Sequence, residues 1–375
     1  MSFYQTIERY RSFDFAAYLA SVTERNVATI LERDRLTELE YLALLSDAAQ
    51  PRIEFMAQKA GVLTRRHFGN AMFIFTPFYI SNYCDSVCPY CSFSRQQSIE
   101  RRHLSIDEVR TEAKRIAEKG IRHILVLTGE SRNKAAPAYC AAAVEAMRDS
   151  FSSIGMEIYP MTEEEYRGLV ERGVDGLTIF QETYHEERYH ALHQGGPKDN
   201  YRFRLDAPER AARQGIRTVS VGALLGLHDP RIDSFFTGLH AAWLQRAFPL
   251  VEVSVCVPRL RPLVAEFVPA FDVSDRRLVQ TIVASRLFLP SAGITLSTRE
   301  NAVFRDAAAR FGVTRMSAGV STAVPGHAGG DATPQFEIAD GRSVGEVKED
   351  LLRMGLQPVM HDWNGALTRN YPPTS

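Results

Sequence analysis

Short apolar runs alternate with helical segments through most of this 375-residue chain. The runs span residues 71–80, 123–128, 156–160, 176–180, 218–221, 251–257, 294–297 and 314–317. Helical segments between them include 105–119, 137–150, 162–172, 206–214, 231–248, 274–288 and 300–311. Such alternation indicates an α/β fold with a parallel sheet, and eight repeats favour a closed (β/α)8 TIM-type barrel. An open doubly wound sheet has the same periodicity and stays the alternative.

The chain predicts one barrel with additions at both ends. Residues 1–66 read as helical, with apolar residues at helical spacing in 36–45, and are expected to form an N-terminal extension packed on the barrel. The barrel is expected over 67–330 and a C-terminal segment over 331–375. No Pro-, Gly- or Ser-rich linker divides the chain before its last few residues.

Composition excludes some classes of partner. The chain is 45% hydrophobic and 24% charged, as in ordinary soluble globular proteins, and its net charge of −1 predicts no nucleic-acid partner. The longest uncharged apolar run, 72–80, is too short to span a bilayer, so no membrane partner is expected. Residues 1–20 mix acids, bases and apolar residues, unlike a targeting peptide, which indicates a cytoplasmic protein.

Three cysteines carry the most specific chemical signal. Cys84, Cys88 and Cys91 form a C-x3-C-x2-C pattern, with Tyr90 just before the third. A cubane [4Fe–4S] cluster has four irons, so three thiolates leave one iron open. An open iron can chelate the amino and carboxylate groups of S-adenosylmethionine (SAM), and the pattern resembles the radical SAM signature. The sequence therefore predicts a [4Fe–4S] cluster and SAM as cofactors.

Other uses of these cysteines are weaker readings. A zinc site could add His103 as its fourth ligand, but zinc sites more often show paired C-x2-C knuckles, and this chain has no second pair. A non-catalytic iron–sulfur protein is the alternative from a different class. Disulfides are not expected, because the five cysteines are an odd number and the chain begins without an apolar signal segment. Cys140 and Cys256 lie far from the triplet and are expected to be buried and structural.

A barrel of this kind places its active residues at the carboxyl ends of the strands. Polar or small residues stand at nearly every expected strand end. Ordinary turns favour the same residue types, but their repetition downstream of a cysteine motif favours a site. The candidates are Tyr79, Gly129, Glu130, Gln181, Glu182, Gly222, Arg259, Arg299 and Ser317.

Longer stretches carry a resemblance to a known family. They include Leu127-Thr128-Gly129-Glu130, Gln181-Glu182-Thr183-Tyr184-His185, Gly222-Ala223-Leu224-Leu225-Gly226-Leu227 and Leu296-Ser297-Thr298-Arg299-Glu300. The chain resembles the 2-iminoacetate synthases, the radical SAM tyrosine lyases of thiamine biosynthesis, over about residues 65–363. Related lyases serve hydrogenase maturation or act on tryptophan. The first carries a second cluster near its C-terminus, whereas this chain has no cysteine after Cys256.

The resemblance implies a reaction and its partners. The enzyme would cleave the Cα–Cβ bond of L-tyrosine to 2-iminoacetate and p-cresol, with SAM reduced to 5′-deoxyadenosine and methionine. The product would serve thiamine thiazole synthesis, so thiazole synthase is the expected protein partner, and a flavodoxin- or ferredoxin-type protein the expected reductant. A tryptophan lyase-like enzyme acting on another aromatic amino acid is the alternative.

The resemblance also implies a set of cofactor-binding residues around SAM, namely Tyr90, Gly129, Glu130, Gln181, Glu182, Arg204 and Gly222. Tyr90 and Gly222 would approach the adenine. Glu130 would receive the amino group of SAM, because a carboxylate suits an ammonium. Arg204 would pair with the SAM carboxylate, although Arg202 stands close enough in the sequence to be confused with it.

A second implied set holds the amino-acid substrate. Arg299 is expected to clamp the substrate carboxylate, since arginine offers a planar fork that lysine lacks. Ser317 would add a hydrogen bond, and Tyr79 would touch the amine end. Arg259 and Arg261 flank the site in the family, with an ion pair that closes the barrel as the equally weighted alternative.

One stretch departs from the family pattern. Residues 322–330 stand where relatives tend to have Pro-Gly-Gly-Tyr, and His327 replaces a small or glycine position. The simpler interpretation of this difference is ordinary loop variation near the barrel mouth. The functional interpretation is that it changes the pocket for the aryl group or the contact with a partner protein.

Overall fold

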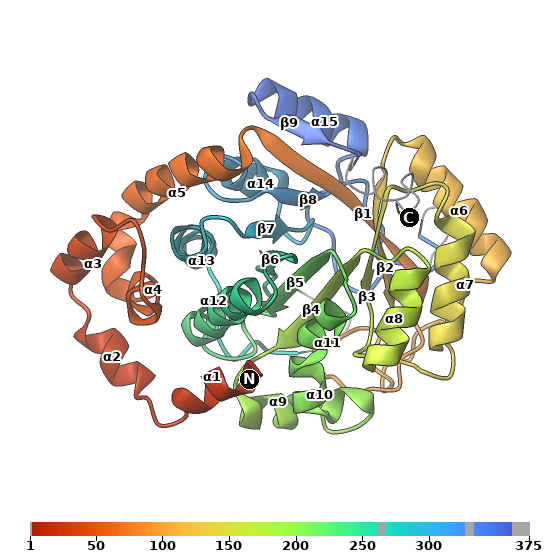
Figure 1. Cartoon of the computed structure of the whole chain (residues 1–375), viewed down its shortest axis with the longest axis horizontal. Helices are drawn as coiled ribbons and strands as arrows, with labels where there is room; N and C mark the ends of the chain where they lie inside the picture. Colours follow the sequence, from red (N-terminus) through yellow and green to blue (C-terminus); the bar gives the residue numbers. More distant parts are fainter. Residues whose placement is uncertain (1, 262–266, 327–333, 362–375) are drawn as a thin grey trace, which may run out of the picture.

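A computed structural model describes residues 2–261, 267–326 and 334–361 of the chain. Eight parallel strands form a closed barrel (Figure 1). Strand β1 pairs with β2 on one side and with β8 on the other, which closes the sheet and rules out the open doubly wound alternative. The strands are β1 Ala71–Ser81, β2 His123–Thr128, β3 Ser153–Glu157, β4 Gly176–Glu182, β5 Thr218–Ala223, β6 Glu252–Cys256, β7 Gly293–Leu296 and β8 Arg315–Ser317.

The third strand corrects one sequence prediction. The apolar run predicts a strand over 156–160, but β3 covers Ser153–Glu157 and ends three residues earlier. Its start is fixed by side-chain contacts rather than by hydrophobicity. Asp175 Oδ1 accepts hydrogen bonds from the Ile154 amide at 2.9 Å and from Ser153 Oγ at 3.0 Å. Tyr159, Pro160 and Met161 therefore belong to the following loop.

The C-terminal segment adds a strand that the sequence did not predict. Strand β9, Gln357–Val359, pairs in parallel with the start of β1, with Ala71 opposite Gln357. Helix α15, Val344–Arg353, precedes it and packs beside β9. Arg305, which is fully buried, forms an ion pair with Asp340 and so ties this segment to the helix after β7.

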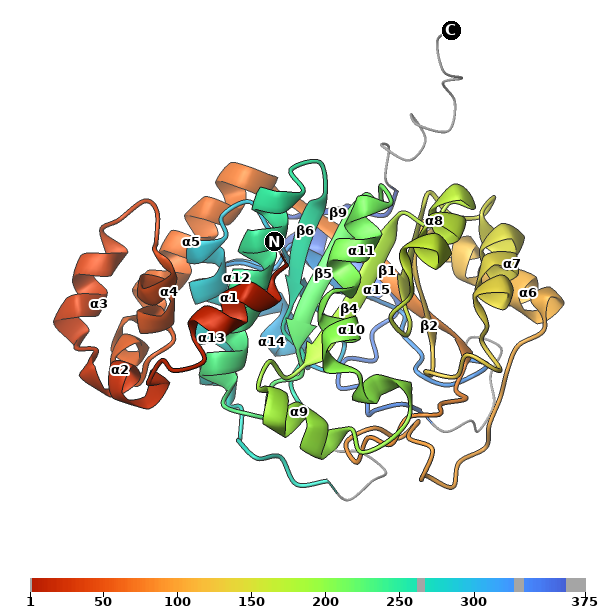
Figure 2. The same ribbon diagram turned by 60° about the horizontal axis from the view of Figure 1, so that its bottom comes forward.

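Helices surround the barrel as the alternation predicts. Their starts are set by caps: Ser105 and Thr162 each form a capping box with the glutamate three residues on. In Figure 2 the arrows of β5 and β6 point toward the edge where α9, α10 and long connections gather. The helices are α6 Ile106–Glu118, α7 Pro137–Met147, α8 Glu163–Glu171, α9 Glu186–Leu192, α10 Tyr201–Leu205, α11 Ala207–Arg213, α12 Pro230–Ala247, α13 Asp275–Phe288 and α14 Ala302–Ala308, with a 3-10 turn η2 at Pro197–Asp199.

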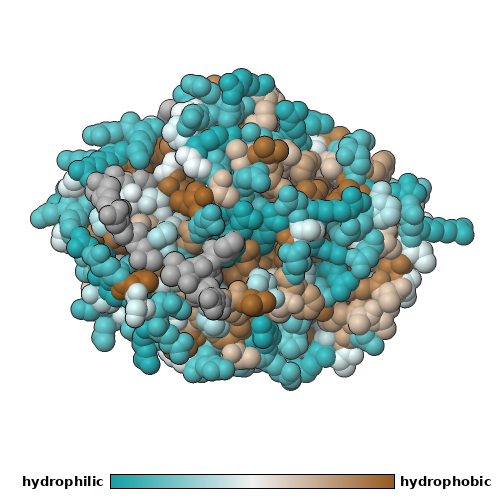
Figure 3. All heavy atoms as spheres, turned by 180° about the vertical axis from the view of Figure 1, so that it is seen from behind, coloured by the Kyte–Doolittle hydropathy of each residue, from teal (hydrophilic) through white to brown (hydrophobic). Residues whose placement is uncertain are grey.

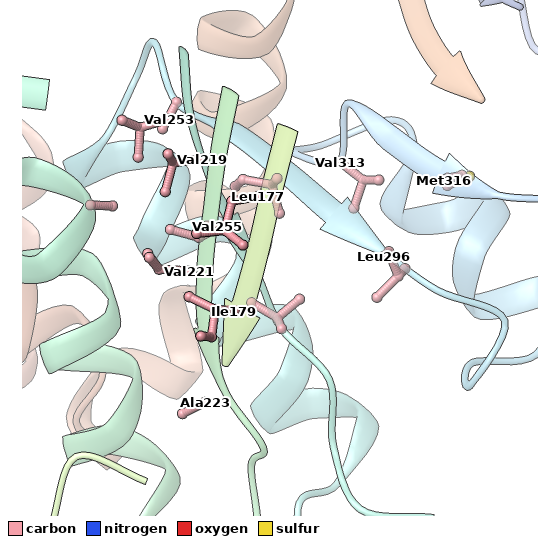
Figure 4. Packing of buried hydrophobic residues seen from close by; sticks show 14 of the residues in the cluster. Leu177, Ile179, Val219, Val221, Ala223, Val253, Val255, Leu296, Val313 and Met316 are labelled. Carbon is pink, nitrogen blue, oxygen red and sulfur yellow. The ribbon is translucent and has the colours of Figure 1, made fainter. Parts of the chain in front are cut away.

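Alternation along the strands separates the packed core from the barrel interior. In β5, Val219 and Val221 are buried in the core, and Figure 4 shows them pointing away from the strand on the side of a neighbouring helix. The intervening Thr218 and Ser220 line the interior cavity instead. Successive side chains of a strand face opposite sides, so this sequence puts branched apolar residues outside and small polar residues inside.

The N-terminal extension is helical, as predicted, and lies beside α12 and α13 (Figure 1). Tyr41 anchors it: the hydroxyl donates to the Ser234 carbonyl at 2.9 Å and lies 3.0 Å from Ser285 Oγ, and the ring stacks on Phe288. Gly238 of α12 faces that ring. The elements are α1 Tyr4–Arg9, α2 Phe15–Ser21, α3 Glu24–Leu31, α4 Glu38–Leu44, η1 Asp47–Arg52 and α5 Ile53–Phe68.

The surface gives no sign of a membrane span. On the face in Figure 3, hydrophilic residues surround small, separate apolar patches. Within the described ranges, every helix is too short or too polar to cross a bilayer.

Substitutions at two helical glycines test the contact between the N-terminal extension and α12. A Cβ at Gly238 would overlap the Tyr41 ring, whereas a Cβ at Gly168 of α8 would meet only the tip of the Arg172 side chain, 3.7 Å away. Alanine is the better helix former at both sites, by about 1 kcal/mol. Gly168→Ala should therefore be neutral or stabilising. Gly238→Ala should lower the free energy of unfolding by about 1–3 kcal/mol, because overpacking a buried contact forces side chains out of place. Denaturant titration measures both, and equal shifts would contradict the docking contact.

Candidate active site

Two cavities that share part of their walls form the site. The larger, of about 200 Å³, runs along the barrel interior, and the smaller, of about 80 Å³, lies under the cysteine loop. Tyr79, Cys91, Glu157, Glu182 and Lys198 line both of them. The cysteine motif and several of the strand ends predicted to be functional therefore meet in one place.

The cysteine loop is held by backbone and side-chain contacts. It leaves the end of β1, and Arg101 binds it from within, donating to the Phe93 carbonyl at 2.8 Å and to the Ser94 carbonyl at 2.7 Å. The Cys88 amide donates to Ser94 Oγ at 3.1 Å. These bonds hold the loop mainly through backbone groups, and none of the three cysteines forms a disulfide.

All three thiols of the motif line the smaller cavity. Burial raises the pKa of Cys84 to about 11 and also raises the pKa values of Cys88 and Cys91. Across the described ranges, no three His, Cys, Asp or Glu side chains are gathered closely enough to hold a single metal ion. The His103 ring packs at a tilt against Tyr139 instead, with 4.1 Å between ring centroids, and it belongs to no described group that could hold a metal ion.

Two residues that follow β2, Gly129 and Glu130, suit a site for an iron–sulfur cluster and SAM. A Cβ at Gly129 would overlap the Tyr83 carbonyl and come within 3.2 Å of Cys84 Cβ, so glycine lets the strand end lie against the cysteine loop. Glu130 follows and lines the same cavity. Its Oε2 is buried without a hydrogen-bond partner, which leaves an acceptor unused on a residue that lines the same cavity as the three thiols. A donor set of three thiols and one orphaned carboxylate oxygen suits three cluster irons and the ammonium of SAM.

Four buried charges form a network beside the thiols. Arg204 Nη1 donates to Glu130 Oε1 at 2.7 Å, and Lys198 Nζ lies 2.6 Å from Glu182 Oε1. Burial alone would raise the pKa of Glu130, but Arg204 and Lys198 hold it below its ordinary value. Glu182 has a φ of 68°, in the left-handed region, and sits where the register between β4 and β5 shifts. Such local strain is common where a side chain must be aimed at a site.

The structure separates the two neighbouring arginines. Arg204 is buried, and besides Glu130 it binds the Phe180 carbonyl at 2.6 Å. Arg202 lies over the Tyr4 ring at 3.6 Å and pairs with Asp206 at the surface. Of the two, only Arg204 lines the cavity under the cysteine loop, and its predicted contact with the SAM carboxylate stays a prediction.

Tyr90 closes one side of the cysteine loop. The His193 Nδ1–H donates to the Tyr189 carbonyl at 2.6 Å, which leaves Nε2 to accept from the Tyr90 hydroxyl, also at 2.6 Å. Burial lowers the pKa of His193 to about 3, so the ring is neutral. Tyr90 also packs with Leu224 and Leu227, which follow β5. Its ring lines the larger cavity, where the predicted contact with adenine stays a prediction.

Tyr79 reaches the site through a residue that the sequence analysis missed. Its hydroxyl donates to Gln335 Oε1 at 2.7 Å, and Gln335 Nε2 lies 3.9 Å from Cys91 Sγ. The backbone N–H of Gln335 donates to the Thr322 carbonyl. One glutamine of the C-terminal segment thus joins the end of β1 to a thiol of the motif.

Arg299 lines the larger cavity, and its guanidinium forms no ion pair within the described part of the chain. The guanidinium stacks 3.5 Å from the centroid of the Phe336 ring, and burial lowers its pKa. Its side chain makes no hydrogen bond or ion pair to any residue that the structure describes. Ser317 lines the same cavity, and its Oγ accepts from the Thr298 amide at 3.2 Å. The cavity therefore holds a free planar cation beside a hydroxyl.

Glu157 is a further residue of the site. It ends β3, is half-buried, and lines both cavities. Burial raises its pKa to about 7, against the opposing effect of Arg299. The sequence analysis missed it because the third strand was placed three residues too late, so that position was read as mid-strand rather than as a strand end.

Some predicted residues lie elsewhere. Gln181 lines neither cavity and instead donates to the Tyr201 carbonyl at 3.4 Å. A Cβ at Gly222 would come within 2.6 Å of the Cys256 carbonyl oxygen, so close strand packing already explains this glycine. Arg259 forms a buried ion pair with Glu300, which agrees with its structural alternative. His327 lies outside the described residues.

The remaining cysteines differ from each other. Cys140 is buried in α7 and donates weakly to the Ala135 carbonyl, as a structural cysteine does. Cys256 is also buried, but it lines the larger cavity.

Comparison with known proteins agrees with this geometry. The sequence matches the Radical SAM superfamily over residues 78–233 and the Biotin and Thiamin Synthesis associated domain over residues 256–357. It is 38% identical to a 2-iminoacetate synthase of Escherichia coli (strain K12), over 96% of this chain and 97% of that protein. Identity to a 2-iminoacetate synthase of Salmonella typhimurium (strain LT2) is also 38%, over 92% and 93% of the two chains.

A solved structure has a similar fold. The FeFe-hydrogenase maturase HydG from Carboxydothermus hydrogenoformans is 29% identical, with a TM-score of 0.87 over 96% of this chain and 84% of that one. Identity above 30% over nearly the full length, together with the cysteine geometry, settles the family. The chain belongs to the 2-iminoacetate synthases of the radical SAM superfamily.

Proposed function

We propose that this chain is a lyase that cleaves the Cα–Cβ bond of L-tyrosine, giving 2-iminoacetate and p-cresol, while SAM becomes 5′-deoxyadenosine and methionine. One observation carries the proposal. The cavity lined by Cys91 of the cluster motif also holds Arg299, a half-buried guanidinium that forms no hydrogen bond or ion pair with any described residue and feels Glu157 only at longer range. A free amino acid supplies the missing carboxylate.

The cofactors fit the cysteine end of the site. Cys84, Cys88 and Cys91 would hold three irons of a [4Fe–4S] cluster, and Glu130 would receive the ammonium of SAM. When bound, the pair supplies a 5′-deoxyadenosyl radical able to take hydrogen from the substrate amine. Arg204 and Lys198 balance the charges of Glu130 and Glu182, so the four charges of the empty site sum to zero.

The chain's own residues orient the amino acid. Arg299 would hold the carboxylate through its fork, with Ser317 as a second donor. Tyr79 would then lie at the amine end, next to Cys91, because both contact Gln335. Glu157, with a pKa of about 7, is placed to exchange a proton with the amino group. A fixed geometry decides which hydrogen is within reach, which is the main demand of a radical reaction.

The product defines the expected partners. 2-Iminoacetate hydrolyses in water, so transfer to thiazole synthase at the open end of the barrel would preserve it. The reductant would be a flavodoxin- or ferredoxin-type protein. Both partners follow from the family and the product chemistry.

Removing a motif cysteine tests the cluster assignment. Cys88→Ala should abolish [4Fe–4S] assembly, because it leaves two thiolates for four irons. Cys140→Ala is the matched control, since that thiol is equally buried but lies in α7. Iron and sulfide analysis after anaerobic reconstitution measures both variants, and equal iron loss would remove the assignment.

An arginine exchange tests the substrate clamp. Arg299→Lys keeps the charge but loses the fork, so p-cresol formation should fall about tenfold or more. SAM cleavage without substrate should survive. Arg202→Lys, at the surface, is the control and should behave as the wild type. Anaerobic assays with tyrosine and tryptophan side by side give the aryl product. Wild-type p-cresol rates in Arg299→Lys would exclude the clamp, and indole products would favour the tryptophan alternative.

A dialysis experiment tests direct transfer. This chain and thiazole synthase should form thiazole faster in one chamber than when a membrane separates them, since free 2-iminoacetate is lost to hydrolysis. The measurement is thiazole yield over time at equal protein concentrations. Equal rates in the two arrangements would show that no complex is needed.

A further inference from the structure

Two consecutive residues of the C-terminal segment contact both ends of the amino-acid site and one thiol of the motif. Gln335 Oε1 accepts a hydrogen bond from the Tyr79 hydroxyl at 2.7 Å, and Gln335 Nε2 lies 3.9 Å from Cys91 Sγ. The next residue, Phe336, packs its ring against the Arg299 guanidinium. Tyr79 and Arg299 are the residues expected at the amine and the carboxylate of the substrate. This short stretch therefore touches both of them and an expected cluster ligand.

Hydrogen bonds to Thr322 hold the stretch in place. The Gln335 N–H donates to the Thr322 carbonyl at 3.1 Å, and the Thr322 hydroxyl donates to the Phe336 carbonyl at 3.2 Å. Thr322 is buried and follows β8. The barrel, rather than the cysteine loop, therefore sets the position from which the Gln335 side chain reaches Cys91.

The chemistry of its two neighbours fixes the orientation of the Gln335 amide. A tyrosine hydroxyl can donate or accept, whereas a thiolate bound to iron can only accept. The amide must therefore present its N–H to Cys91 and its oxygen to Tyr79, as the structure has it. Hydrogen bonds to an ionised acceptor are stronger than those to a neutral one, so this contact gains strength once Cys91 is a thiolate.

A donor beside a cluster sulfur changes the reduction potential of the cluster. The reduced form carries one more negative charge than the oxidised form, so the donor stabilises the reduced form more and raises the potential. We propose that Gln335 is a positioning residue that couples the amino-acid site to the cluster through its N–H contact with the Cys91 sulfur.

The direction of the hydrogen bonds carries the coupling, and this part rests on the proposed function, in which the substrate amine lies against Tyr79. The ammonium of an amino acid can only donate, so it donates to the Tyr79 oxygen. The Tyr79 hydroxyl donates to Gln335, and Gln335 donates to Cys91. All three bonds run from the substrate toward the sulfur. Hydrogen bonds in such a chain polarise one another, so the bound amine strengthens the last bond and makes the cluster easier to reduce.

The coupling has a consequence for the order of events. Coupling between two sites is reciprocal, so the reduced cluster should hold tyrosine more tightly by the same factor by which tyrosine favours reduction. Reduction, and the SAM cleavage that follows it, is thereby favoured when the substrate is in place.

The test measures the reduction potential of the cluster rather than turnover. The full chain is reconstituted with its cluster and with S-adenosylhomocysteine, which lacks the methyl group of SAM and has no sulfonium to cleave. Redox titration followed by electron paramagnetic resonance gives the ratio of reduced to oxidised cluster. Without tyrosine, Gln335→Leu should lower that ratio about threefold at a fixed solution potential, because one hydrogen bond to sulfur is lost. Gln58→Leu, at an exposed position of α5, is the control and should match the wild type.

Adding saturating tyrosine tests the coupling itself. In the wild type, tyrosine should raise the ratio of reduced to oxidised cluster about twofold. Tyr79→Phe removes the hydroxyl that joins the substrate to Gln335, so the rise should be absent in Tyr79→Phe and in Gln335→Leu. If Gln335→Leu does not fold, Gln335→Glu replaces it, since its carboxylate still accepts from Tyr79 but offers no N–H to Cys91.

Either of two results would overturn the proposal. One is an equal ratio in the wild type and Gln335→Leu without tyrosine; the other is a tyrosine-induced rise of wild-type size in Gln335→Leu or Tyr79→Phe. Calorimetry checks tyrosine binding separately in each variant. A wild-type chain that binds no tyrosine would contradict the proposed substrate, whereas the comparison made without tyrosine would still decide whether Gln335 acts on the cluster.

Discussion

The structure depends on the hydrogen bonding of β1 to three other strands. It pairs with β2 and β8 to close the barrel and with β9 to recruit the C-terminal segment. The same strand ends at Tyr79 and leads directly into the cysteine loop. The same strand therefore closes the sheet and positions the cysteine motif. The contacts of Gln335 with Tyr79 and Cys91 depend on that position.

The interior chemistry follows from a choice of side chains along the strands. Branched apolar residues face the helices and build the core, so the inward positions are free to be small or charged. Charges placed there are balanced in two ways. Glu130 and Glu182 pair with Arg204 and Lys198, whereas the Arg299 side chain forms no hydrogen bond or ion pair with the described residues. The first arrangement stabilises the empty site, and the second leaves it ready for anions.

Much of this could be predicted from the sequence, and the failures have physical causes. The number and order of the strands followed from periodicity, and the structure agrees with them apart from the bounds of the third strand. The preference for Arg204 over Arg202 came from the family resemblance, and of the two only Arg204 is buried in the structure. Strand β3 starts at a side-chain contact with Asp175, which hydrophobicity does not report, and that error hid Glu157. Lys198 and Gln335 lie outside the strand ends, on a 3-10 turn and in the C-terminal segment, so no rule about barrels points to them.

The pairing of β1 with β9 has a consequence for synthesis of the chain. Strand β1 and the cysteine loop leave the ribosome early, while β8, Gln335 and β9 follow only near the end. Contacts between such distant segments form late in folding because the intervening chain must first be ordered. During that interval the three thiols are solvent-exposed and open to oxidation, and equally open to a cluster-delivery protein. The topology thus places the cysteine loop earlier in synthesis than the strands that close the barrel beside it.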